Sequence, residues 1–501
     1  MKVLKSKVFS ISILIVFFAI FMHSHKSNLH KDLIGIHMWR QTQTQLNIQQ
    51  FYRNDFNILN PRVNTLNGEG NIKRFEFPIM QWLIAGIMKI YGEESLLITR
   101  LCIAFITFWS FIGIYQLAKL LSRNEAASLM TAGLYLCSPL VFYYGINPIP
   151  DNMALLCAIW FCYYFFRYKQ SDFTNLKEGI LSAIFISLSI LAKLPYAIFG
   201  SMALFALIFE RNSTLKWTNI NTKRHIIIFS LALVPPLIWY GSIIHNWGSE
   251  SIVGGIINGM SFDRIKIVLL HHWNHTTKDF FFNHYAVYAF YCSIPFTVYG
   301  ILYSKNIFKS YLTTLTLSVF VYFIYELNMI DIIHDYYMMP FLVPLYLMLL
   351  HSLHLIYKTH KIIFFILFIL ALFMPSVTYK QCKSYYTAEK AGMDPTLAAH
   401  YIEMRNLIPK KEKCIILNDD SASILPYFLD KEGYIFDKDG MEVIWMDDMI
   451  RNKEARYMYS NSRKIESDTL FPQFIDSLIW TKGNYNIFKL KDPKDLPSKR
   501  Y

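Results

Sequence analysis

Residues 8–22, VFSISILIVFFAIFM, form an unbroken apolar run directly behind Lys2, Lys5 and Lys7. This order of charged and apolar residues is typical of a signal peptide or of a first membrane span. The following residues, HSHKSN, contain no small-x-small cleavage site. We therefore interpret the run as an uncleaved span whose N-terminus stays in the cytoplasm.

Apolar runs of spanning length continue along the next 350 or so residues, and the whole chain of 501 residues is 54% hydrophobic and 17% charged. The further runs cover 96–120, 126–145, 149–167, 179–193, 195–209, 225–245, 283–303, 310–328, 336–357 and 361–378. Together they predict a mainly α polytopic membrane protein with about eleven transmembrane helices.

Nearly all of the net charge of +13 comes from the predicted membrane part, the residues before 380. From residue 380 onward the chain has 20 of its 49 Lys and Arg residues and 19 of its 36 Asp and Glu residues, which leaves 29 against 17 before that point. Such an excess indicates cytoplasmic loops and acidic lipid, so nucleic acid is not a predicted partner. An odd number of spans would place the residues after 379 on the outer side of the membrane.

The last 120 or so residues differ from the rest, because short apolar runs alternate there with polar ones. KCIILND, GYIFD and GNYNIFKL resemble strands, and DPTLAAHYIEMRNLI resembles an amphipathic helix. We predict a transmembrane domain over 1–379 and a small soluble α/β domain over 380–501.

The first outer loop, 24–95, is long for a simple connection and contains HMWRQTQTQ at 37–45. Arg40 can pair with phosphate oxygens, Trp39 can contact a sugar or lipid headgroup, and His37 and Gln41 add neutral polar groups. The alternative is a solvated amphipathic helix beside the membrane.

The same loop continues into NIKRFEFPIMQW, where Lys73, Arg74 and Glu76 precede a short apolar segment that we expect to lie along the membrane surface. Lys73 and Arg74 suit a lipid-linked phosphate, although they could equally extend to the interface as ordinary anchoring residues. A carboxylate between two phenylalanines is costly without a partner, which makes Glu76 a candidate general base.

Two further ionisable residues stand at predicted outer helix ends. Asp151, in NPIPDN, could be a helix cap, a catalytic carboxylate or both. Lys193, in LAKLPYAIF, is a cation at the membrane edge, for which a donor phosphate is a natural partner.

A late polar cluster, IHDYYMMP, brings His334, Asp335, Tyr336 and Tyr337 to the start of another span. It is either an aromatic belt or the closing side of the same outer site. HHWNH at 271–275 lacks carboxylate or Cys partners at metal-ligand spacing, so we predict no metal site and no cofactor, with a divalent metal left as an option. No nucleotide-binding or hydrolase motif is present in the sequence.

The ordered motifs resemble those of GT-C fold glycosyltransferases of family 39 type, which include bacterial relatives of the protein O-mannosyltransferases and lipid A aminoarabinose transferases with an RgtA/B/C/D-like membrane domain. The likeness covers roughly residues 5–380. The motifs that carry it are HMWRQTQT, FYRNDFNILNPRVN, FEFPIMQWLIAGIMKIYGEESLLITRL, SPLVFYYGINPIPDNMALL, LAKLPYAIF and HDYYMMPFLVPL.

The resemblance implies an inverting hexosyl or pentosyl transferase that moves a sugar from a polyprenyl phosphate to a lipid, glycan or protein acceptor, such as lipopolysaccharide, on the periplasmic face. It implies that Asp151 matches the family's second-loop acidic residue and that Lys193 matches a lysine near the donor phosphate. Many members have an Asp-Glu pair where this chain has Arg40-Gln41, so Glu76 and Asp151 are the candidate bases.

A polytopic transporter or lipid-linked sugar flippase is the alternative function. Transporters usually carry charges near the membrane midplane and show internal repeats. The candidate residues here stand at predicted helix ends, which favours the enzyme.

Overall fold

The computed structural model describes residues 7–67, 71–246, 308–332, 334–417, 421–436, 441–461 and 471–496, together with 263, 266, 267 and 270. Contacts divide the chain into two compact units, and each unit is assembled from separate stretches of sequence. Unit 1 contains residues 1–30, 75–80 and 99–383, and unit 2 contains residues 31–74, 81–98 and 384–501.

Unit 1 is helical throughout its described residues. Its main helices are α1 (Lys7–Ser24), α4 (Leu96–Ser122), α5 (Glu125–Leu136), α6 (Pro139–Tyr144), α7 (Asp151–Gln170), α8 (Leu176–Ala192), α9 (Ser201–Phe209), α10 (Ile220–Ile243), α14 (Phe308–Ile332), α15 (Leu342–Thr359) and α16 (Lys361–Cys382). Two 3-10 helices, η3 (Leu194–Gly200) and η5 (Asp335–Phe341), precede α9 and α15.

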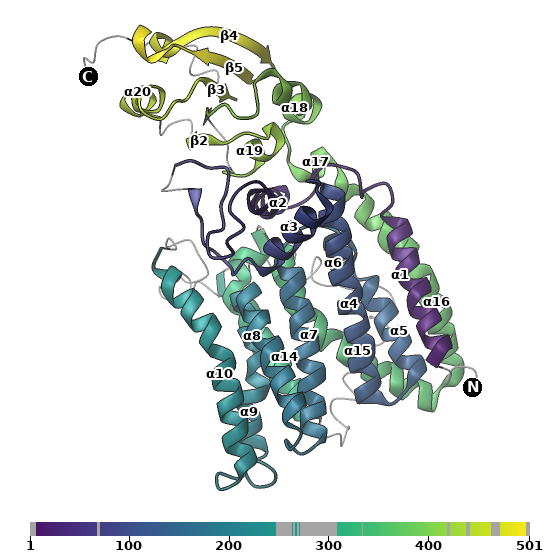
Figure 1. Ribbon diagram of the computed structural model, residues 1–501. Helices are drawn as coiled ribbons and strands as arrows, with labels where there is room; N and C mark the ends of the chain where they lie inside the picture. Colours follow the sequence, from purple (N-terminus) through teal and green to yellow (C-terminus); the bar gives the residue numbers. More distant parts are fainter. Residues whose placement is uncertain are drawn as a thin grey trace. The chain divides into compact units, whose positions relative to one another are not determined.

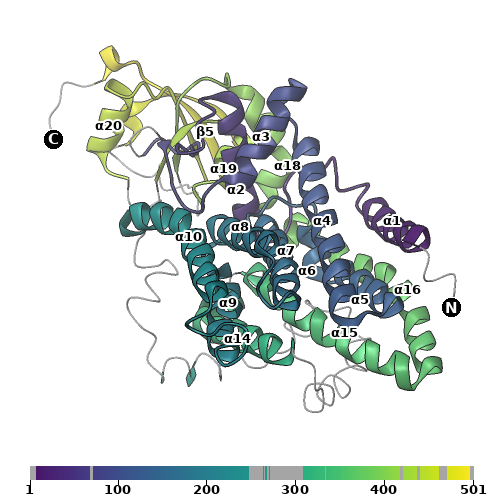
Figure 2. The same cartoon turned by 60° about the horizontal axis from the view of Figure 1, so that its bottom comes forward.

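Neighbouring helices of unit 1 form two groups. Helices α7, α8 and α10 pack side by side (Figure 1), and α1, α5, α15 and α16 form the other group (Figure 2). Many side chains on these helices are apolar yet exposed, among them Phe105, Leu237 and Phe365. Apolar side chains on the outside of a helical bundle are expected where lipid replaces water as the surrounding solvent.

The length and composition of the helices agree with a membrane protein. Among the described residues, four helical stretches are long and apolar enough to cross a bilayer: 96–122, 220–243, 335–359 and 361–386. The prediction of one continuous span over 126–145 is wrong, because α5 ends at Leu136 and α6 begins at Pro139. Proline lacks an N–H and forces extended backbone on Ser138, which separates the two helices. The predicted span 283–303 lies outside the described residues.

Unit 2 contains a five-stranded sheet in the order β2-β1-β3-β5-β4. Strand β1 (Cys414–Leu417) pairs in parallel with β2 (Gly433–Phe436) and β3 (Tyr457–Ser460), whereas β5 (Tyr485–Leu490) runs antiparallel between β3 and β4 (Ile475–Lys482). The predicted strands near 414, 433 and 485 are confirmed, and so is the helix α18 (Pro395–Leu407). Strands β3 and β4 were not predicted.

The other helices of unit 2 are α2 (Met38–Arg53), α3 (Ile79–Tyr91), η6 (Lys383–Tyr386), α17 (Ala388–Ala391), α19 (Ile424–Leu429), α20 (Val443–Arg451), η7 (Phe471–Phe474) and η8 (Pro493–Asp495). One apolar core joins both ends of the sequence, because Leu33, Met38 and Leu46 share a buried cluster with Met404 and Phe428. Unit 2 is therefore built from the first loop and the C-terminal residues together.

Candidate functional site

Lys193 is the centre of a buried charged cluster in unit 1. Its Nζ lies 3.0 Å from Oε1 of Glu76 and 3.6 Å from Oδ2 of Asp151. The side chains of Lys193, Asp151 and Glu76 are 5%, 1% and 14% exposed, so Glu76 is the most accessible of the three. The three charged residues that the sequence singled out in separate motifs thus meet in one place.

The local backbone at Lys193 explains its position. Helix α8 ends at Ala192, Lys193 itself is extended with φ −160° and ψ 113°, and Pro195 lies in the first turn of η3. Proline at the start of a new helical turn favours an extended residue before it and ends the preceding helix. The side chain of Lys193 therefore leaves the chain at a break between two helices.

Asp151 is the first residue of α7, after Pro148 and Pro150. The N-cap residue of α7 is Pro150, so Asp151 occupies the first helical position, where a carboxylate favours the helix dipole. The same carboxylate pairs with Lys193.

The loop before α7 is held by polar side chains that sequence reasoning did not select. Asn152 Nδ2 donates to the carbonyls of Tyr144 (2.9 Å) and Asn147 (3.0 Å), and Arg100 Nη1 donates to Oδ1 of Asn147 (3.0 Å). Asn152, Asn147 and Arg100 are all buried. The sequence could have indicated these residues, because amide and guanidinium groups next to or within apolar runs need polar partners.

Glu76 lies in an extended segment that is fastened on both sides of it. The N–H of Phe77 donates to the carbonyl of Leu191 (3.0 Å), and Trp239 Nε1 donates to the carbonyl of Phe75 (3.0 Å). These bonds tie the segment to the end of α8 and to α10. The Glu76 carboxylate is thereby directed to Lys193, two residues beyond Leu191.

Aromatic rings cover Lys193 from η5. Its Nζ lies 5.0 Å from the ring centroid of Tyr337 and 5.8 Å from that of Tyr336, distances at which a cation is attracted to a ring. The ring of His334 packs 5.2 Å from Tyr336 and 5.0 Å from Tyr337. The late polar cluster of the sequence is therefore part of the Lys193 environment.

Asp335 links η5 to α6. Tyr144 Oη donates a hydrogen bond to Oδ1 of Asp335 at 2.5 Å, and the rings of Tyr144 and Tyr336 meet edge to face at 5.8 Å. Asp335 thus orients the aromatic pair that covers Lys193. Tyr144 was not among the predicted site residues.

The remaining predicted residues belong to unit 2. Helix α2 begins just after His37, whose backbone is left-handed with φ 53°. Trp39 is half-buried, Arg40 and Gln41 are buried, and Gln41 Nε2 donates to the carbonyl of Ile36 at 2.8 Å. Arg40 Nη1 bonds Oε1 of Gln43.

The burial of α2 argues against a solvated surface helix. Seven of its eleven buried residues are polar, and four are apolar; the polar ones are Arg40, Gln41, Thr42, Thr44, Gln45, Asn47 and Gln50. Buried polar groups need specific partners and seldom accumulate without a role in structure or binding. The binding of a ligand by α2 stays a prediction.

Lys73 and Arg74 are exposed at the end of the first stretch of unit 2. Arg74 donates from Nε to the carbonyl of Leu59 (2.9 Å) and from Nη2 to Oδ1 of Asn60 (3.0 Å). These two bonds hold the guanidinium of Arg74 against the turn at Leu59 and Asn60. The contact of Lys73 and Arg74 with phosphate remains a prediction.

The part of the chain that the structure describes contains no group of three or more His, Cys, Asp or Glu side chains able to hold a metal ion. HHWNH at 271–275 lies outside the described residues.

Residues 76–239 match the family model described as dolichyl-phosphate-mannose-protein mannosyltransferase. This segment begins at Glu76 and includes Asp151 and Lys193. No curated protein matched the sequence.

Solved structures match over nearly the whole chain. ArnT from Cupriavidus metallidurans bound to undecaprenyl phosphate is 10% identical, with a TM-score of 0.66 over 98% of this chain and 99% of that chain. The apo state of the same protein matches with a TM-score of 0.63 at 11% identity, and the same shares of the two chains are covered. The Archaeoglobus fulgidus oligosaccharyltransferase complex with Zn and sulfate matches with a TM-score of 0.57 at 12% identity, over 97% of this chain and 74% of that chain.

These similarities concern the arrangement of the helices and of the C-terminal sheet. The family model supports a glycosyltransferase over the segment that carries the charged cluster. The chain has the GT-C fold of polytopic membrane glycosyltransferases, with a small C-terminal sheet domain.

Proposed function

We propose that this protein is a membrane glycosyltransferase that transfers a sugar from a polyprenyl-phosphate donor to a lipid, glycan or protein acceptor at the periplasmic face of a bacterial inner membrane. The single observation that carries the proposal is the cluster of Lys193, Glu76 and Asp151 at helix ends of unit 1. The fold, and the undecaprenyl phosphate bound to ArnT, support a lipid-linked donor.

The reaction needs few groups. An acceptor oxygen attacks C1 of the sugar, the bond between C1 and the phosphate oxygen breaks, and its electron pair leaves with the lipid phosphate. The acceptor proton passes to a carboxylate. A single displacement of this kind inverts the configuration at C1.

The exposed fractions of the two carboxylates are the basis for giving them different roles. Glu76, at 14% exposed, is the carboxylate that can reach an acceptor, so we assign it as the general base. Asp151, at 1% exposed, orients Lys193 from the buried side. Lys193 stabilises the negative charge that develops on the leaving phosphate.

The aromatic residues and unit 2 supply binding contacts in this proposal. Tyr336 and Tyr337 face the sugar or lipid next to Lys193, with His334 and Asp335 holding them in place. Within unit 2, we propose as substrate-binding residues His37, Trp39, Arg40, Gln41, Lys73 and Arg74. Arg40 and Arg74 suit phosphate because the guanidinium fork matches its oxygens.

The test is transfer of radiolabelled sugar from undecaprenyl phosphate to a membrane and glycan extract by the purified protein. Glu76→Gln is expected to lower the rate about 100-fold or more, as loss of a general base does. Glu125→Gln is the matched control, because Glu125 forms a similar ion pair with Lys119 (2.9 Å) elsewhere in unit 1. Transfer in the control should equal that of the wild type.

Three other outcomes are informative. No transfer from any polyprenyl-phosphate sugar, together with movement of the labelled lipid across proteoliposomes, would overturn the proposal in favour of a flippase. Equal rates for Glu76→Gln and wild type, with loss in Asp151→Asn, would move the base to Asp151. Full activity in both variants would indicate an acceptor that is already ionised, such as a phosphate.

A further inference from the structure

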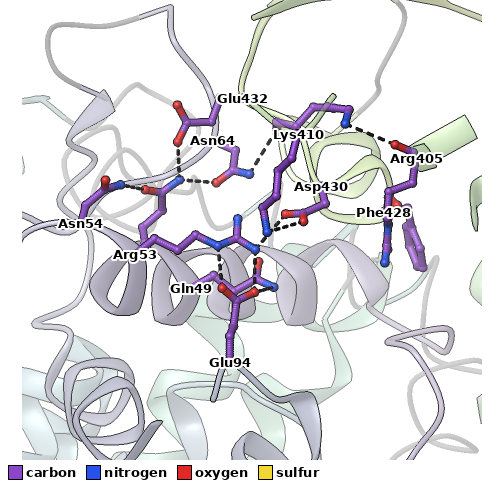
Figure 3. A network of polar contacts seen from close by, with 12 residues as sticks. Gln49, Arg53, Asn54, Asn64, Glu94, Arg405, Lys410, Phe428, Asp430 and Glu432 are labelled. Atoms are coloured by element: carbon purple, nitrogen blue, oxygen red, sulfur yellow. Dashed lines mark hydrogen bonds and ion pairs between the residues drawn. The ribbon is translucent and has the colours of Figure 1, made fainter. Parts of the chain in front are cut away.

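The C-terminal end of α2 is held by a branched ion-pair network in unit 2 (Figure 3). Arg53 Nη2 lies 2.8 Å from Oδ1 of Asp430, and the same guanidinium donates to Glu94 from Nε (2.6 Å) and Nη2 (2.5 Å). Arg53, Glu94 and Asp430 are about one-fifth exposed. A two-pronged contact to Glu94 with a third bond to Asp430 fixes both the position and the plane of the guanidinium.

Asp430 is shaped for this contact by its own backbone. It follows α19 in the left-handed conformation, with φ 51° and ψ 47°, and turns its carboxylate back towards α2. Lys410 Nζ binds the second oxygen, Oδ2, at 2.7 Å. One carboxylate of the C-terminal stretch therefore joins a cation from the first loop to a cation that follows α18.

A second set of bonds lies one turn earlier on α2. Gln50 Nε2 donates to Oδ1 of Asn64 (2.6 Å) and to Oε1 of Glu432 (2.9 Å), and Asn64 Nδ2 donates to the carbonyl of Lys431 (3.1 Å). Gln50 and Asn64 are buried. Satisfied buried amides of this kind specify one register of α2 on the C-terminal stretch.

Residues 64–67 extend the sheet beyond β2. Gly433 N donates to the carbonyl of Asn64 (3.0 Å), Leu66 N donates to the carbonyl of Gly433 (2.9 Å), and Thr65 forms a parallel bridge with Gly433. The Asn67 side chain then bonds both the N–H (2.8 Å) and the carbonyl (2.6 Å) of Ile435. The first loop thus covers a sheet edge that would otherwise offer unpaired backbone groups.

The segment that leads into α2 is fastened too. Tyr401 Oη and Tyr427 Oη both donate to the carboxylate of Asp32 at 2.8 Å, and Ile36 N donates to the carbonyl of Tyr385 at 3.0 Å. Contacts at both ends prevent a helix from sliding or rotating on its support. The stretch 32–53, with Trp39 and Arg40 inside it, is therefore held at each end by the C-terminal residues.

We propose that the C-terminal domain belongs to the substrate-binding machinery, with Arg53 and Asp430 as positioning residues that set the place of α2. The proposal rests on the proposed function, in which Arg40 on α2 binds a phosphate group of a substrate. Arg53 and Asp430 themselves do not touch the donor. They fix the position of the polar residues at the start of α2 relative to the C-terminal stretch of unit 2.

The test compares Asp430→Asn with wild type in the full-length protein. Asparagine is among the residues that tolerate left-handed backbone, so this change removes the charge and keeps the conformation. Glu454→Gln is the matched control, because Glu454 forms an ion pair with Lys413 (2.9 Å) within the C-terminal stretch. Two quantities are measured: the Kd for undecaprenyl phosphate, and hydrogen exchange in α2, β1 and β3.

Asp430→Asn is expected to weaken binding of undecaprenyl phosphate about tenfold or more, since small displacements of binding groups are costly. Without denaturant, where amides also exchange through local opening, exchange should become faster in α2 by a larger factor than in β1 and β3. Arg53→Lys, which keeps the charge but loses the fork, should show a smaller change in the same direction. Glu454→Gln should alter neither quantity.

Wild-type affinity in both Asp430→Asn and Arg53→Lys would overturn the positioning proposal. If Asp430→Asn speeds exchange in β1 and β3 as much as in α2, Arg53→Lys decides the question, and unchanged affinity in Arg53→Lys would contradict the positioning proposal. If the wild type binds no undecaprenyl phosphate, the proposed function fails instead. Faster exchange confined to α2 would then still show that the ion pair fastens this helix.

Discussion

Lys193 is a buried cation balanced by two carboxylates, Glu76 and Asp151. Taking charges out of water is costly, and the cost is offset only while the partners remain together. This mutual dependence explains how three ionisable residues can persist among apolar helices.

Lys193→Met is expected to destabilise unit 1 by about 3–5 kcal/mol, because two carboxylates would remain buried without their cation. Adding Asp151→Asn should recover part of that loss, since one of the uncompensated charges is removed. Thermal unfolding of the single and double variants in one detergent measures the coupling. Strictly additive losses in the double variant would contradict the expected coupling between Lys193 and Asp151.

The carboxyl group of Asp430 is expected to make the stability of unit 2 depend on pH. Burial alone would raise the pKa of its carboxyl, but the charges of Arg53 and Lys410 outweigh burial and hold the pKa below its usual value. A carboxyl with a lowered pKa in the folded state stabilises that state above the unfolded pKa of about 3.9. This contribution is lost as the pH falls through the lower, folded pKa.

We therefore expect Asp430→Asn to be less stable than wild type at pH 7, with a difference that shrinks as the pH falls below about 4. Urea titrations of unit 2, followed by pulsed hydrogen exchange between pH 3 and pH 7, measure both stabilities. A difference that stays constant over this range would show that the Asp430 charge is not its source.

At the scale of elements, the loop between α6 and α7 determines where Asp151 begins its helix. Asn152 supplies the donors for two buried carbonyls of that loop, at Tyr144 and Asn147. Asn152→Ala would remove both bonds. The carbonyl of Tyr144 still accepts from the N–H of Asn147 at 3.0 Å, so the expected loss of about 1–3 kcal/mol comes from the buried carbonyl of Asn147. Sugar transfer should fall with it, because Asp151 and Lys193 lose their fixed geometry.

Asn219→Ala serves as the control for that prediction. Asn219 caps α10 by accepting from the N–H of Asn221 at 3.0 Å, and its loss costs about 1 kcal/mol of helix stability. Thermal unfolding and transfer rates are measured for both variants. Equal losses of transfer in the two variants would mean that general destabilisation, and not the loop at Asp151, lowers the rate.

At the scale of the whole molecule, unit 2 combines stretches separated by about three hundred residues of unit 1. Leu33 and Leu46 from the first loop share a core with Met404 and Phe428. Removing either stretch from that core would expose apolar surface that the other stretch cannot cover. We expect the two to unfold as one cooperative unit.

Hydrogen exchange of the wild type at increasing urea tests this cooperativity. Amides of α2 and of β1 and β3 should converge on one free energy of opening, distinct from that of the helices of unit 1. Independent opening of α2 at much lower urea than β1 would contradict a shared core, and would favour a loop that only rests on the sheet.

Much of the fold was predictable because its determinants are local. Apolar runs such as 96–120 exceed the bilayer thickness, and the alternation in KCIILND and GNYNIFKL indicates short buried strands. The break at Ser138 follows from Pro139, and the sequence contained that signal too. Strands β3 and β4 were less visible, since β4 is a largely exposed edge strand with little apolar alternation.

The sequence by itself determined that this chain is a helical membrane protein with a long first loop and a C-terminal α/β stretch, because hydropathy and periodicity act over a few neighbouring residues. It also singled out Glu76, Asp151 and Lys193 as ionisable groups in costly surroundings. Only the tertiary structure decided that these three share one cluster under Tyr336 and Tyr337, and that the first loop shares a core with the C-terminal residues. Those contacts join residues tens to hundreds of positions apart, and their pairing depends on how whole helices pack.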